Sequence, residues 1–497
     1  AWEAVHYFPS GMEKRMKKTN VKMVTLAVFI TTFMSAIEGT IVSTAMPTII
    51  ADLDGLAIMS WVVSVFLLMT AVSTPIYGKL ADSVGRKPVF LFGIGLFVIG
   101  SALCGFSHSM VELIIFRVLQ GLGSGAIQTA GVTVLADMYD IDKRAKMLGL
   151  TSGFWGLASV IAPLLGGFIV QKLSWHWVFM INVPIGLLAF LLVAFYLHED
   201  FAKNKLQIDL KGSFSLVIFL LSLMLLLQGL EKGFNWTLLL LAAIMLVSLW
   251  AFTKVEKTAA DPIIPFSILK DKEFLAVNIL QLLVSGVVIG FEFYIPTWLQ
   301  GINGVSASIA GFAITPSSLL WVCGSFLAGD LMGRWGTQKY FDASLLLLIG
   351  ADLAFILIPT YTPFWVFCLI AVFNGIGFGS IATASQVRAQ MVVDKSQVGV
   401  ATSFNTLMKY LGQTVMMVFY GMTFNVVVAS GLKKQPSLTS EMMNKIVSPV
   451  QAKSLDPAVL APLREILHSS MRGIYIVSLI ALLLSLVFNH IYRQKKD

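Results

Sequence analysis

Residues Met34–Pro47 read MSAIEGTIVSTAMP and place one carboxylate, Glu38, inside an apolar run that begins near Met23. With a rise of about 1.5 Å per residue, Glu38 lies roughly 22 Å along a helix that must cross about 30 Å of hydrocarbon. A charge at that depth costs several kcal/mol unless it faces water, a partner or the protein interior. The stretch therefore predicts a membrane-spanning helix that carries a functional carboxylate.

The composition of the whole chain agrees with a membrane location. Of its 497 residues, 57% are hydrophobic and only 12% are charged, which predicts a polytopic membrane protein. The net charge of +8 does not indicate nucleic acid, because the basic residues lie in short loops between apolar runs. Cys104, Cys323 and Cys368 fall inside apolar runs without metal-type spacing, so we expect neither disulfides nor a metal site.

Apolar runs of about 20 residues, separated by polar breaks, predict an all-α fold with fourteen transmembrane helices. The predicted spans are Met23–Pro47, Ile58–Ala81, Pro88–Phe106, Met110–Met138, Ala145–Lys172, Trp175–Leu197, Gly212–Gly229, Trp236–Thr253, Phe274–Gln300, Ser306–Gly333, Phe341–Thr360, Pro363–Val393, Val398–Asn425 and Gly473–Tyr492.

Lysine and arginine gather in alternate loops of this arrangement. The short loops on one side hold only Lys172 and Lys232, whereas the other side carries many basic residues. The positive-inside rule therefore predicts that both termini are cytoplasmic. Residues 426–472 form a long basic segment on the outside, which does not weaken this prediction because long loops translocate largely regardless of charge. Residues 456–473 within it have helical spacing and predict a short helix.

The chain also contains an internal repeat. VLQGLGSGAIQTA (Val118–Ala130) resembles VFNGIGFGSIATA (Val372–Ala384) at an offset of 254, and GKLADSVG (Gly78–Gly85) resembles GDLMGRWG (Gly329–Gly336) at an offset of 251. Repeats that run in the same direction predict two parallel six-helix bundles with two inserted helices. The predicted divisions are a cytoplasmic segment at 1–22, an N-terminal bundle at 23–197, the inserted helices 7 and 8 with their loops at 198–272, and a C-terminal bundle at 273–497. We interpret the first ten residues as a fusion remnant. The C-terminal bundle includes the extracellular loop 426–472.

The loop after the second span reads GKLADSVGRKPVFL (Gly78–Leu91). Gly78 permits close helix approach, and Asp82 can accept hydrogen bonds at a helix end. The stretch resembles the loop 2–3 signature of the major facilitator superfamily, GxLaDrxGrk, with Ser83 in place of the usual basic residue. The alternative interpretation is an ordinary basic loop.

Residues Leu113–Gly125, LIIFRVLQGLGSG, resemble the fourth-span signature of that superfamily, which is built around an arginine, here Arg117. Arg117 reaches the same depth as Glu38 to within a turn. Because a buried guanidinium needs acceptors, we predict that Arg117 and Glu38 interact, directly or through water, as a proton-coupling pair. The alternative is that Arg117 binds only backbone carbonyls.

The fifth span, GLTSGFWGLASVIAPLLGG, places small residues on one face, and Pro163 bends it. It resembles the gxxxGPxxGG motif of the antiporters of the superfamily, with Ala162 in place of a glycine; a tight helix contact without function is the alternative. Asp137 closes the fourth span, where it can pair with Arg86 and latch the inner gate in the outward-facing state. Gating roles are thus predicted for Gly78, Asp82, Gly85, Arg86, Asp137 and Pro163.

Four features together resemble the fourteen-span drug:proton antiporter family: the span count, the Glu38 element, DPIIPFSILKDKEF after the eighth span, and VGVATSFNTLMKYLGQ in the thirteenth. This resemblance implies a monomeric, proton-driven multidrug exporter of the bacterial cell membrane. It implies lipophilic or cationic substrates, no cofactor other than the proton gradient, and no nucleic-acid partner. Glu38 stands where the family commonly has Asp.

Several polar or aromatic side chains inside the spans are candidates for substrate contact. Glu292 can recognise a cation, carry a second proton or be a solvated rim residue. We interpret Asp352 as a structural hydrogen-bonding group and Lys409 as a packing residue between the halves. The predicted substrate contacts are Glu292, Phe33, Met34, Gln128, Phe154, Trp155, Asn278, Gln281, Tyr294 and Asn374.

Other functions remain open at this point. One alternative is export of an endogenous lipid, peptide or signalling metabolite, and Lys409 keeps anionic cargo among the candidates. A membrane-embedded enzyme or lipid-handling scaffold would need a nucleophile with its base, or a metal cluster, inside the spans. His176 is the only near-membrane candidate, and we interpret it as an interfacial anchor. The chain is thus not expected to be an enzyme, and without a P-loop we do not expect ATP to drive it.

Overall fold

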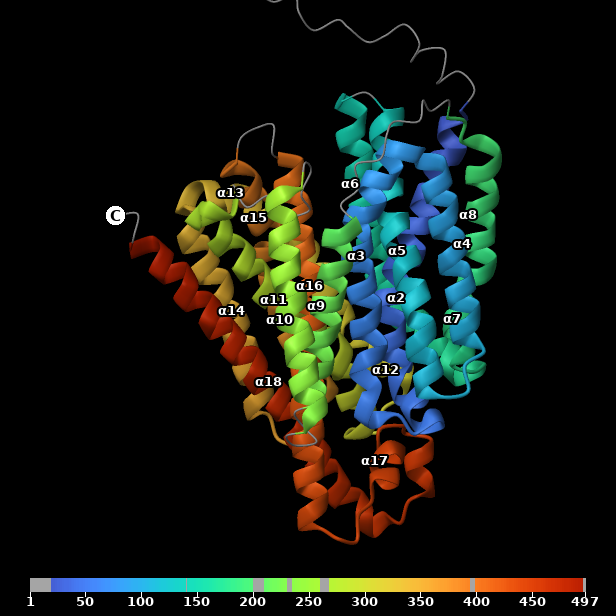
Figure 1. Cartoon of the computed structure of the whole chain (residues 1–497). Helices are drawn as coiled ribbons and strands as arrows, with labels where there is room; N and C mark the ends of the chain where they lie inside the picture. Colours follow the sequence, from blue (N-terminus) through green and yellow to red (C-terminus); the bar gives the residue numbers. More distant parts are fainter. Residues whose placement is uncertain are drawn as a thin grey trace, which may run out of the picture.

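A computed structural model describes residues 19–139, 141–199, 210–229, 235–259, 268–393 and 398–494, and every regular element in these ranges is a helix (Figure 1). Twelve described helices are long and apolar enough to cross a membrane. Two apolar segments, Val160–Lys172 and Lys211–Leu226, are shorter. The all-helical membrane class is therefore confirmed, and twelve of the fourteen predicted spans have spanning length.

The first group of helices covers most of the N-terminal third of the chain. Its members are α2 (Val21–Leu53), α3 (Met59–Val84), α4 (Arg86–Gly105), α5 (Met110–Met138), α6 (Ile141–Lys172), α7 (His176–Met180) and α8 (Asn182–Tyr196). They pack mainly on one another. We call them the first half.

The second group of helices lies beside the first (Figure 1). Its members are α11 (Lys272–Gly301), α12 (Ala307–Phe312), α13 (Thr315–Trp335), α14 (Thr337–Leu357), α15 (Phe364–Met391), α16 (Val398–Lys434), α17 (Ser440–Ile446) and α18 (Pro457–Gln494). We call them the second half.

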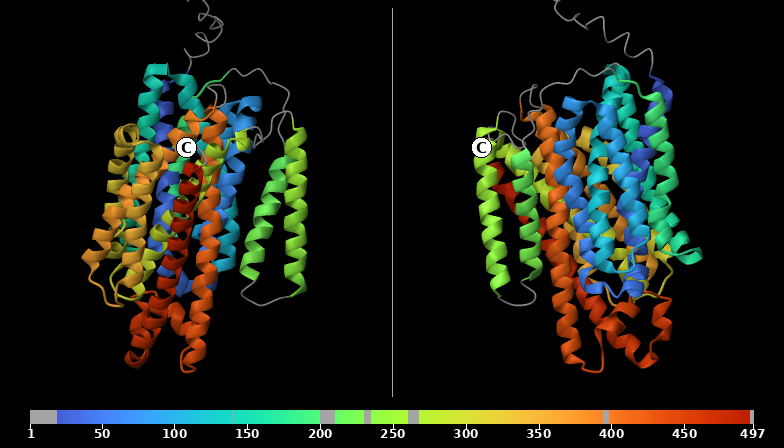
Figure 2. Two further views of the ribbon diagram at one scale, coloured as in Figure 1. Left: turned by 90° about the vertical axis from the view of Figure 1, so that its left-hand side faces the viewer. Right: turned by 45° about the vertical axis from the view of Figure 1, so that its right-hand side comes forward.

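Helices α9 (Leu210–Gly229) and α10 (Trp236–Thr258) pair with each other, and α9 also contacts α3 and α16. Figure 2 shows this pair at the edge of the molecule. Only 17% of the most apolar part of α10 is buried inside the protein. Large apolar side chains such as Trp250 and Leu246 are exposed there, as expected for a surface that faces lipid.

Local sequence explains where the helices begin and end. Asn20 caps α2 by accepting a hydrogen bond from the backbone N–H of Met23, and Ser109 caps α5 in the same way. The backbone reverses between α3 and α4 at Gly85 (φ 111°) and between α13 and α14 at Gly336 (φ 81°). Both are left-handed conformations that favour glycine. They are the final glycines of the two repeated loop motifs, so the repeat is visible in the backbone.

The helix at the C-terminal end is longer than predicted. The sequence predicts a short outer helix at residues 456–473 and a separate span from Gly473, but α18 runs without a break from Pro457 to Gln494. No proline follows Pro462 in this stretch, and a single glycine inside a helix costs only about 1 kcal/mol. Gly473 is therefore accommodated inside the helix.

The two halves meet most closely at one end of the bundle, where α17 lies (Figure 1). We call this the α17 end, and the opposite end, where α2 begins and α18 ends, the Arg86 end. Gln300 donates a hydrogen bond to the carbonyl of Thr44 (3.1 Å) across the halves. Pro163 of α6 packs so tightly on Gly311 of α12 that a Cβ there would lie 2.8 Å from it. The α17 end is thus closed.

The segment that contains α17 adds to this closure. The side chain of Asn444 donates to Asp54 (3.2 Å) and accepts from the backbone N–H of Leu56 (3.3 Å). Asn425 of α16 donates to the carbonyl of Ala57 (2.7 Å). The second half therefore holds the α2–α3 connection of the first half in place.

Candidate functional site

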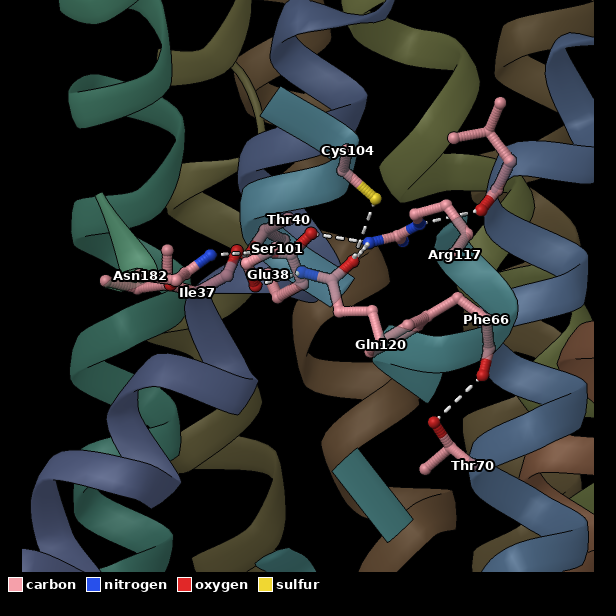
Figure 3. A network of polar contacts seen from close by, with 11 residues as sticks. Ile37, Glu38, Thr40, Phe66, Thr70, Ser101, Cys104, Arg117, Gln120 and Asn182 are labelled. Atoms are coloured by element: carbon pink, nitrogen blue, oxygen red, sulfur yellow. Dashed lines mark hydrogen bonds and ion pairs between the residues drawn. The ribbon is translucent and has the colours of Figure 1, made fainter. Parts of the chain in front are cut away.

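A charged pair lies in the interior of the first half (Figure 3). Arg117 of α5 donates from Nη1 to Oε1 of Glu38 of α2 at 2.5 Å. The side chains are 1% and 0% exposed, respectively. The predicted contact between Arg117 and Glu38 is present, and it is direct. Its function in proton coupling is a separate question.

Two amide side chains complete the shell around this pair. Asn182 of α8 donates to the other carboxylate oxygen of Glu38 at 2.7 Å. Gln120 accepts from Nη1 of Arg117 at 2.7 Å and donates to Ser101 of α4 at 2.8 Å. Each carboxylate oxygen of Glu38 thus has its own donor, and four helices of the first half are tied together around it.

The guanidinium of Arg117 is held from further directions. Its Nε donates to the carbonyl of Val62 of α3 at 2.9 Å. Its Cζ lies 4.2 Å from the ring centroid of Phe66, which is cation–π distance. The alternative that Arg117 binds only backbone carbonyls is therefore wrong, although the planar guanidinium does bind one carbonyl in addition to the carboxylate.

The site is sealed in this conformation, since Glu38 has no exposed surface. Breaking such a buried pair by removing one partner typically costs about 3–5 kcal/mol. The pair is consequently a stable structural unit as long as both groups are charged. A proton that reached Glu38 would remove its charge and leave Arg117 without a counter-ion.

The second half has a counterpart at the corresponding position. Glu292 of α11 lies 254 residues after Glu38, which is the offset of the repeat. The same offset places Ala371 where Arg117 stands. The cation comes from another helix, because Glu292 interacts electrostatically with Lys409 of α16.

Lys409 lies at a small pocket within the second half. Ser285 of α11 also donates to the backbone carbonyl of Lys409 at 2.9 Å. Lys409 thus faces a mixed polar and aromatic wall in addition to its electrostatic interaction with Glu292. The residues that line this pocket are Gln281, Val284, Ser285, Val288, Trp321, Phe378, Ala382, Lys409 and Gln413.

Two of the predicted polar substrate contacts, Gln128 and Gln281, hydrogen-bond to other side chains in this structure. Gln128 of α5 accepts from the hydroxyl of Tyr410 of α16 at 2.7 Å, which joins the two halves. Gln281 accepts from Ser385 at 2.5 Å. These hydrogen bonds engage the side-chain oxygens of Gln128 and Gln281 within the protein in this conformation.

Two further predicted amides are buried in the second half. Asn278 of α11 accepts from Asn405 of α16 at 3.1 Å. Asn374 of α15 is fully buried, and neither atom of its amide has a hydrogen-bond partner in the described part of the chain. Asn374 is the repeat counterpart of Gln120, so an amide recurs at this position in both halves.

The predicted apolar contacts are mostly internal packing. Met34 is 1% exposed and its sulfur lies 3.4 Å from the Cβ position of Gly186 of α8. Phe154 stacks on Phe29 with ring centroids 4.7 Å apart. Tyr294 is fully buried between Tyr420 and Phe424 of α16. Phe33 is half-buried, and the side chain of Trp155 lies outside the described residues.

At the Arg86 end, Nε of Arg86 contacts Oδ2 of Asp137 at 2.8 Å. The predicted pair is present, but both residues belong to the first half, so the contact joins α4 to α5 and does not bridge the halves. Sequence reasoning missed Glu199, whose carboxylate accepts from the backbone N–H groups of Arg86 and Lys87 at the start of α4. The side chain of Asp82 lies outside the described residues.

A family model described as the Major Facilitator Superfamily matches residues 28–417. The chain belongs to this superfamily. Among curated proteins it is 34% identical over 417 residues to "Multidrug transporter protein MdtP" of Bacillus subtilis, which covers 83% of this chain and 77% of that protein. It is 33% identical over 492 residues to "Multidrug resistance protein 3" of the same organism, with 95% of each chain covered.

The solved structures agree on the fold. A bacterial homologue of the human lysosomal transporter Spinster, in an inward-facing and unoccupied conformation, superposes with a TM-score of 0.68 at 18% identity, covering 94% of this chain and 97% of that one. The protein is therefore a multi-pass membrane transporter of the superfamily and not an enzyme, with multidrug efflux proteins among its relatives. The membrane-embedded enzyme alternative is excluded on this ground.

Proposed function

We propose that this transporter is a proton-coupled multidrug efflux antiporter. It exports lipophilic or cationic compounds across the bacterial cell membrane and works as a monomer with fourteen crossings. The observation that carries the proposal is the sealed pair of Glu38 and Arg117. A carboxylate inside a membrane-spanning bundle is expensive to maintain and marks a functional site by default. The names of the two Bacillus subtilis relatives support the class of cargo.

The Arg86 end is cytoplasmic in this proposal, because the positive-inside rule assigns the basic loops to that side. The bonds from Gln300 to Thr44 and from Asn444 to Asp54 then close the outer side. The structure accordingly represents an inward-facing or occluded state. Export requires the halves to rock so that the α17 end opens and the Arg86 end closes.

The coupling step follows from the electrostatics of the pair. In the outward-facing state Glu38 takes a proton from the more acidic outer solution and becomes neutral. In the inward-facing state it gives up that proton to the cytoplasm, and Arg117 and Asn182 then hold the carboxylate as seen here. Because Glu38 has no exposed surface in this conformation, exchange of its proton requires movement of α2 relative to α5.

Substrate binding is assigned mainly to the second half. Glu292 is half-buried and attracts a cationic group, whereas Lys409 attracts an anionic or accepting group. Lipophilic cations therefore displace the interaction of Glu292 with Lys409. Lys409 also supports the second candidate, an exporter of an anionic endogenous lipid or signalling metabolite.

Proteoliposomes that contain the purified protein test this proposal directly. An imposed pH gradient is expected to drive ethidium against its concentration gradient in the wild type, and Glu38→Gln is expected to abolish this. Glu441→Gln is the matched control, because Glu441 is an exposed carboxylate whose partner Lys445 lies one turn away. If ethidium transport by the wild type does not depend on the imposed pH gradient, the proposal is contradicted.

A further inference from the structure

A second buried carboxylate lies in the other half of the molecule. Asp352 of α14 is 1% exposed, and its Oδ2 atom accepts no hydrogen bond from any residue that the structure describes. In the ranges that the structure describes, no lysine or arginine forms an ion pair with it. The sequence-based interpretation of Asp352 as a hydrogen-bonding group is therefore wrong for this atom.

The surroundings of Asp352 are aromatic. Asp352 interacts electrostatically with the phenols of Tyr475 of α18 and Tyr420 of α16. Tyr475 stacks on Phe355, one turn after Asp352, with ring centroids 4.6 Å apart. Trp298 of α11 closes the cluster, with its ring centroid 5.8 Å from that of Tyr475. Four helices of the second half thus enclose the carboxyl group.

Two hydrogen-bond donors of this cluster are unused. Within the described part of the chain, the hydroxyl of Tyr475 and the indole N–H of Trp298 are buried without a hydrogen-bond partner. An ionised carboxylate that interacts with Tyr475 would be expected to recruit its unused hydroxyl, since an unpaired buried charge is costly. The absence of such a bond indicates that the carboxyl group is neutral here.

We propose that Asp352 is a second proton-binding site, separate from the pair of Glu38 and Arg117. It carries a proton in the conformation that is closed at the α17 end. When α14 and α18 shift against each other, the hydroxyl of Tyr475 comes within reach and donates to the carboxylate, and the proton passes to water. The carboxyl group loses one proton and gains one hydrogen bond.

The chemistry of the neighbours favours a proton over a metal cation. Phenols and an indole N–H are donors and poor ligands for a hard cation, which needs several oxygen ligands. The other titratable groups around the cluster are Tyr294, next to Tyr420, and His468, next to Trp298. Tyr420 is already engaged, because its hydroxyl contacts Ser478 at 2.8 Å and the carbonyl of Gly286 at 3.0 Å. Of the two phenols that interact with Asp352, Tyr475 is thus the one whose hydroxyl is unused among the described residues.

Infrared spectroscopy of the purified protein, without substrate or gradient, tests the site itself. A neutral carboxylic acid absorbs apart from carboxylates and amides, so Asp352→Asn is expected to remove one carboxylic-acid band. Asp342→Asn is the matched control on the same helix, because Asp342 already accepts from Asn489 at 2.8 Å; it is expected to leave the band. Identical bands in the wild type and Asp352→Asn overturn the proposal.

Two further variants extend the test. If Asp352→Asn does not fold, Tyr475→Phe is expected to shift the pH at which the band disappears, and an unchanged titration counts against the site. A cross-link between Thr44→Cys and Gln300→Cys locks the α17 end and is expected to preserve the band as the pH is raised, whereas the reduced protein loses it. Equal titrations in both forms overturn the conformational release. These readouts are independent of drug transport.

Discussion

Glu38 and Glu292 stand at corresponding positions of the repeat in the two halves, but they differ in burial and in the cation that interacts with them. Glu38 is fully buried and bound by Arg117, whose position is fixed by Val62 and Gln120. Glu292 is half-buried, and its cation is Lys409 on a different helix. A guanidinium holds a carboxylate in one geometry, whereas a lysine ammonium is a mobile point charge.

This difference indicates that one acid serves proton coupling and the other serves substrate binding. A carboxylate in a rigid, dry shell changes its environment sharply when it loses its charge, which suits coupling to protons. A carboxylate at a wetter site with a flexible partner tolerates ligands of different shape, which suits cargo binding. The two halves therefore carry acids at corresponding positions, and the difference between Arg117 and its counterpart Ala371 separates their proposed functions.

The largest expected effect on transport is the contrast between the two neutralised acids. Glu38→Gln is expected to reduce gradient-driven ethidium export by at least about 100-fold, equivalent to about 2.7 kcal/mol. Glu292→Gln is expected to keep the gradient dependence and lose no more than about tenfold, with a changed preference among substrates. Export rates in proteoliposomes measure both. Equal losses would remove the proposed division.

Removal of the arginine tests the stability of the sealed site. Arg117→Leu leaves Glu38 buried without a counter-charge, which is expected to cost about 3–5 kcal/mol. The double variant Arg117→Leu with Glu38→Leu is expected to recover much of that loss. Thermal unfolding in detergent provides the measurement, and Lys409→Leu is the counterpart with a smaller expected effect. A double variant as unstable as Arg117→Leu alone would argue against the pair.

A smaller difference in stability is expected between the loss of a hydrogen bond to a charged group and the loss of one to a neutral group. Asn182→Leu removes a bond to the Glu38 carboxylate and is expected to cost about 1.5–3 kcal/mol. Ser385→Ala removes a neutral bond to Gln281 in the second half and is expected to cost about 0.5–1.5 kcal/mol. The same unfolding assay ranks them. The reverse order would show that Glu38 is not charged in this conformation.

The smallest effect is expected at the Arg86 end. The contact between Arg86 and Asp137 is partly exposed, so either charge reversal alone should change stability by no more than about 1 kcal/mol. Arg86→Glu combined with Asp137→Arg is expected to restore part of the export that each single reversal loses. Export assays on all three variants decide this, and a complete lack of rescue would rule out a gating function for the pair.

The sequence predicts the contacts that lie within recognisable motifs. Arg117 and Glu38 reach a similar depth in their spans, and Arg86 lies in the signature loop Gly78–Leu91, so depth, charge and motif together predict both pairs. Asn182 and Gln120 were missed, although each is a polar residue in an apolar span. Which polar residues meet depends on how each helix is rotated, and the hydropathy of a span does not determine that.

Other features depend on packing that the pattern does not encode. Met34 faces α8 instead of a cavity because Gly186 leaves space for it. The sequence predicts Asp352 as an ordinary structural polar group, and only the packing of the folded chain leaves its Oδ2 atom without a partner among the described residues. The continuity of α18 across Gly473 likewise reflects its packing on α11, α14 and α16.

The most direct test of the central claim is proton release on cargo binding. Ethidium is added to purified protein in weakly buffered detergent solution that contains a pH indicator dye. The wild type and Glu292→Gln, the latter at higher ethidium concentration, are expected to release protons, and Glu38→Gln is expected to release none while still binding ethidium. Undiminished proton release from Glu38→Gln would contradict the assignment of Glu38 as the coupling acid.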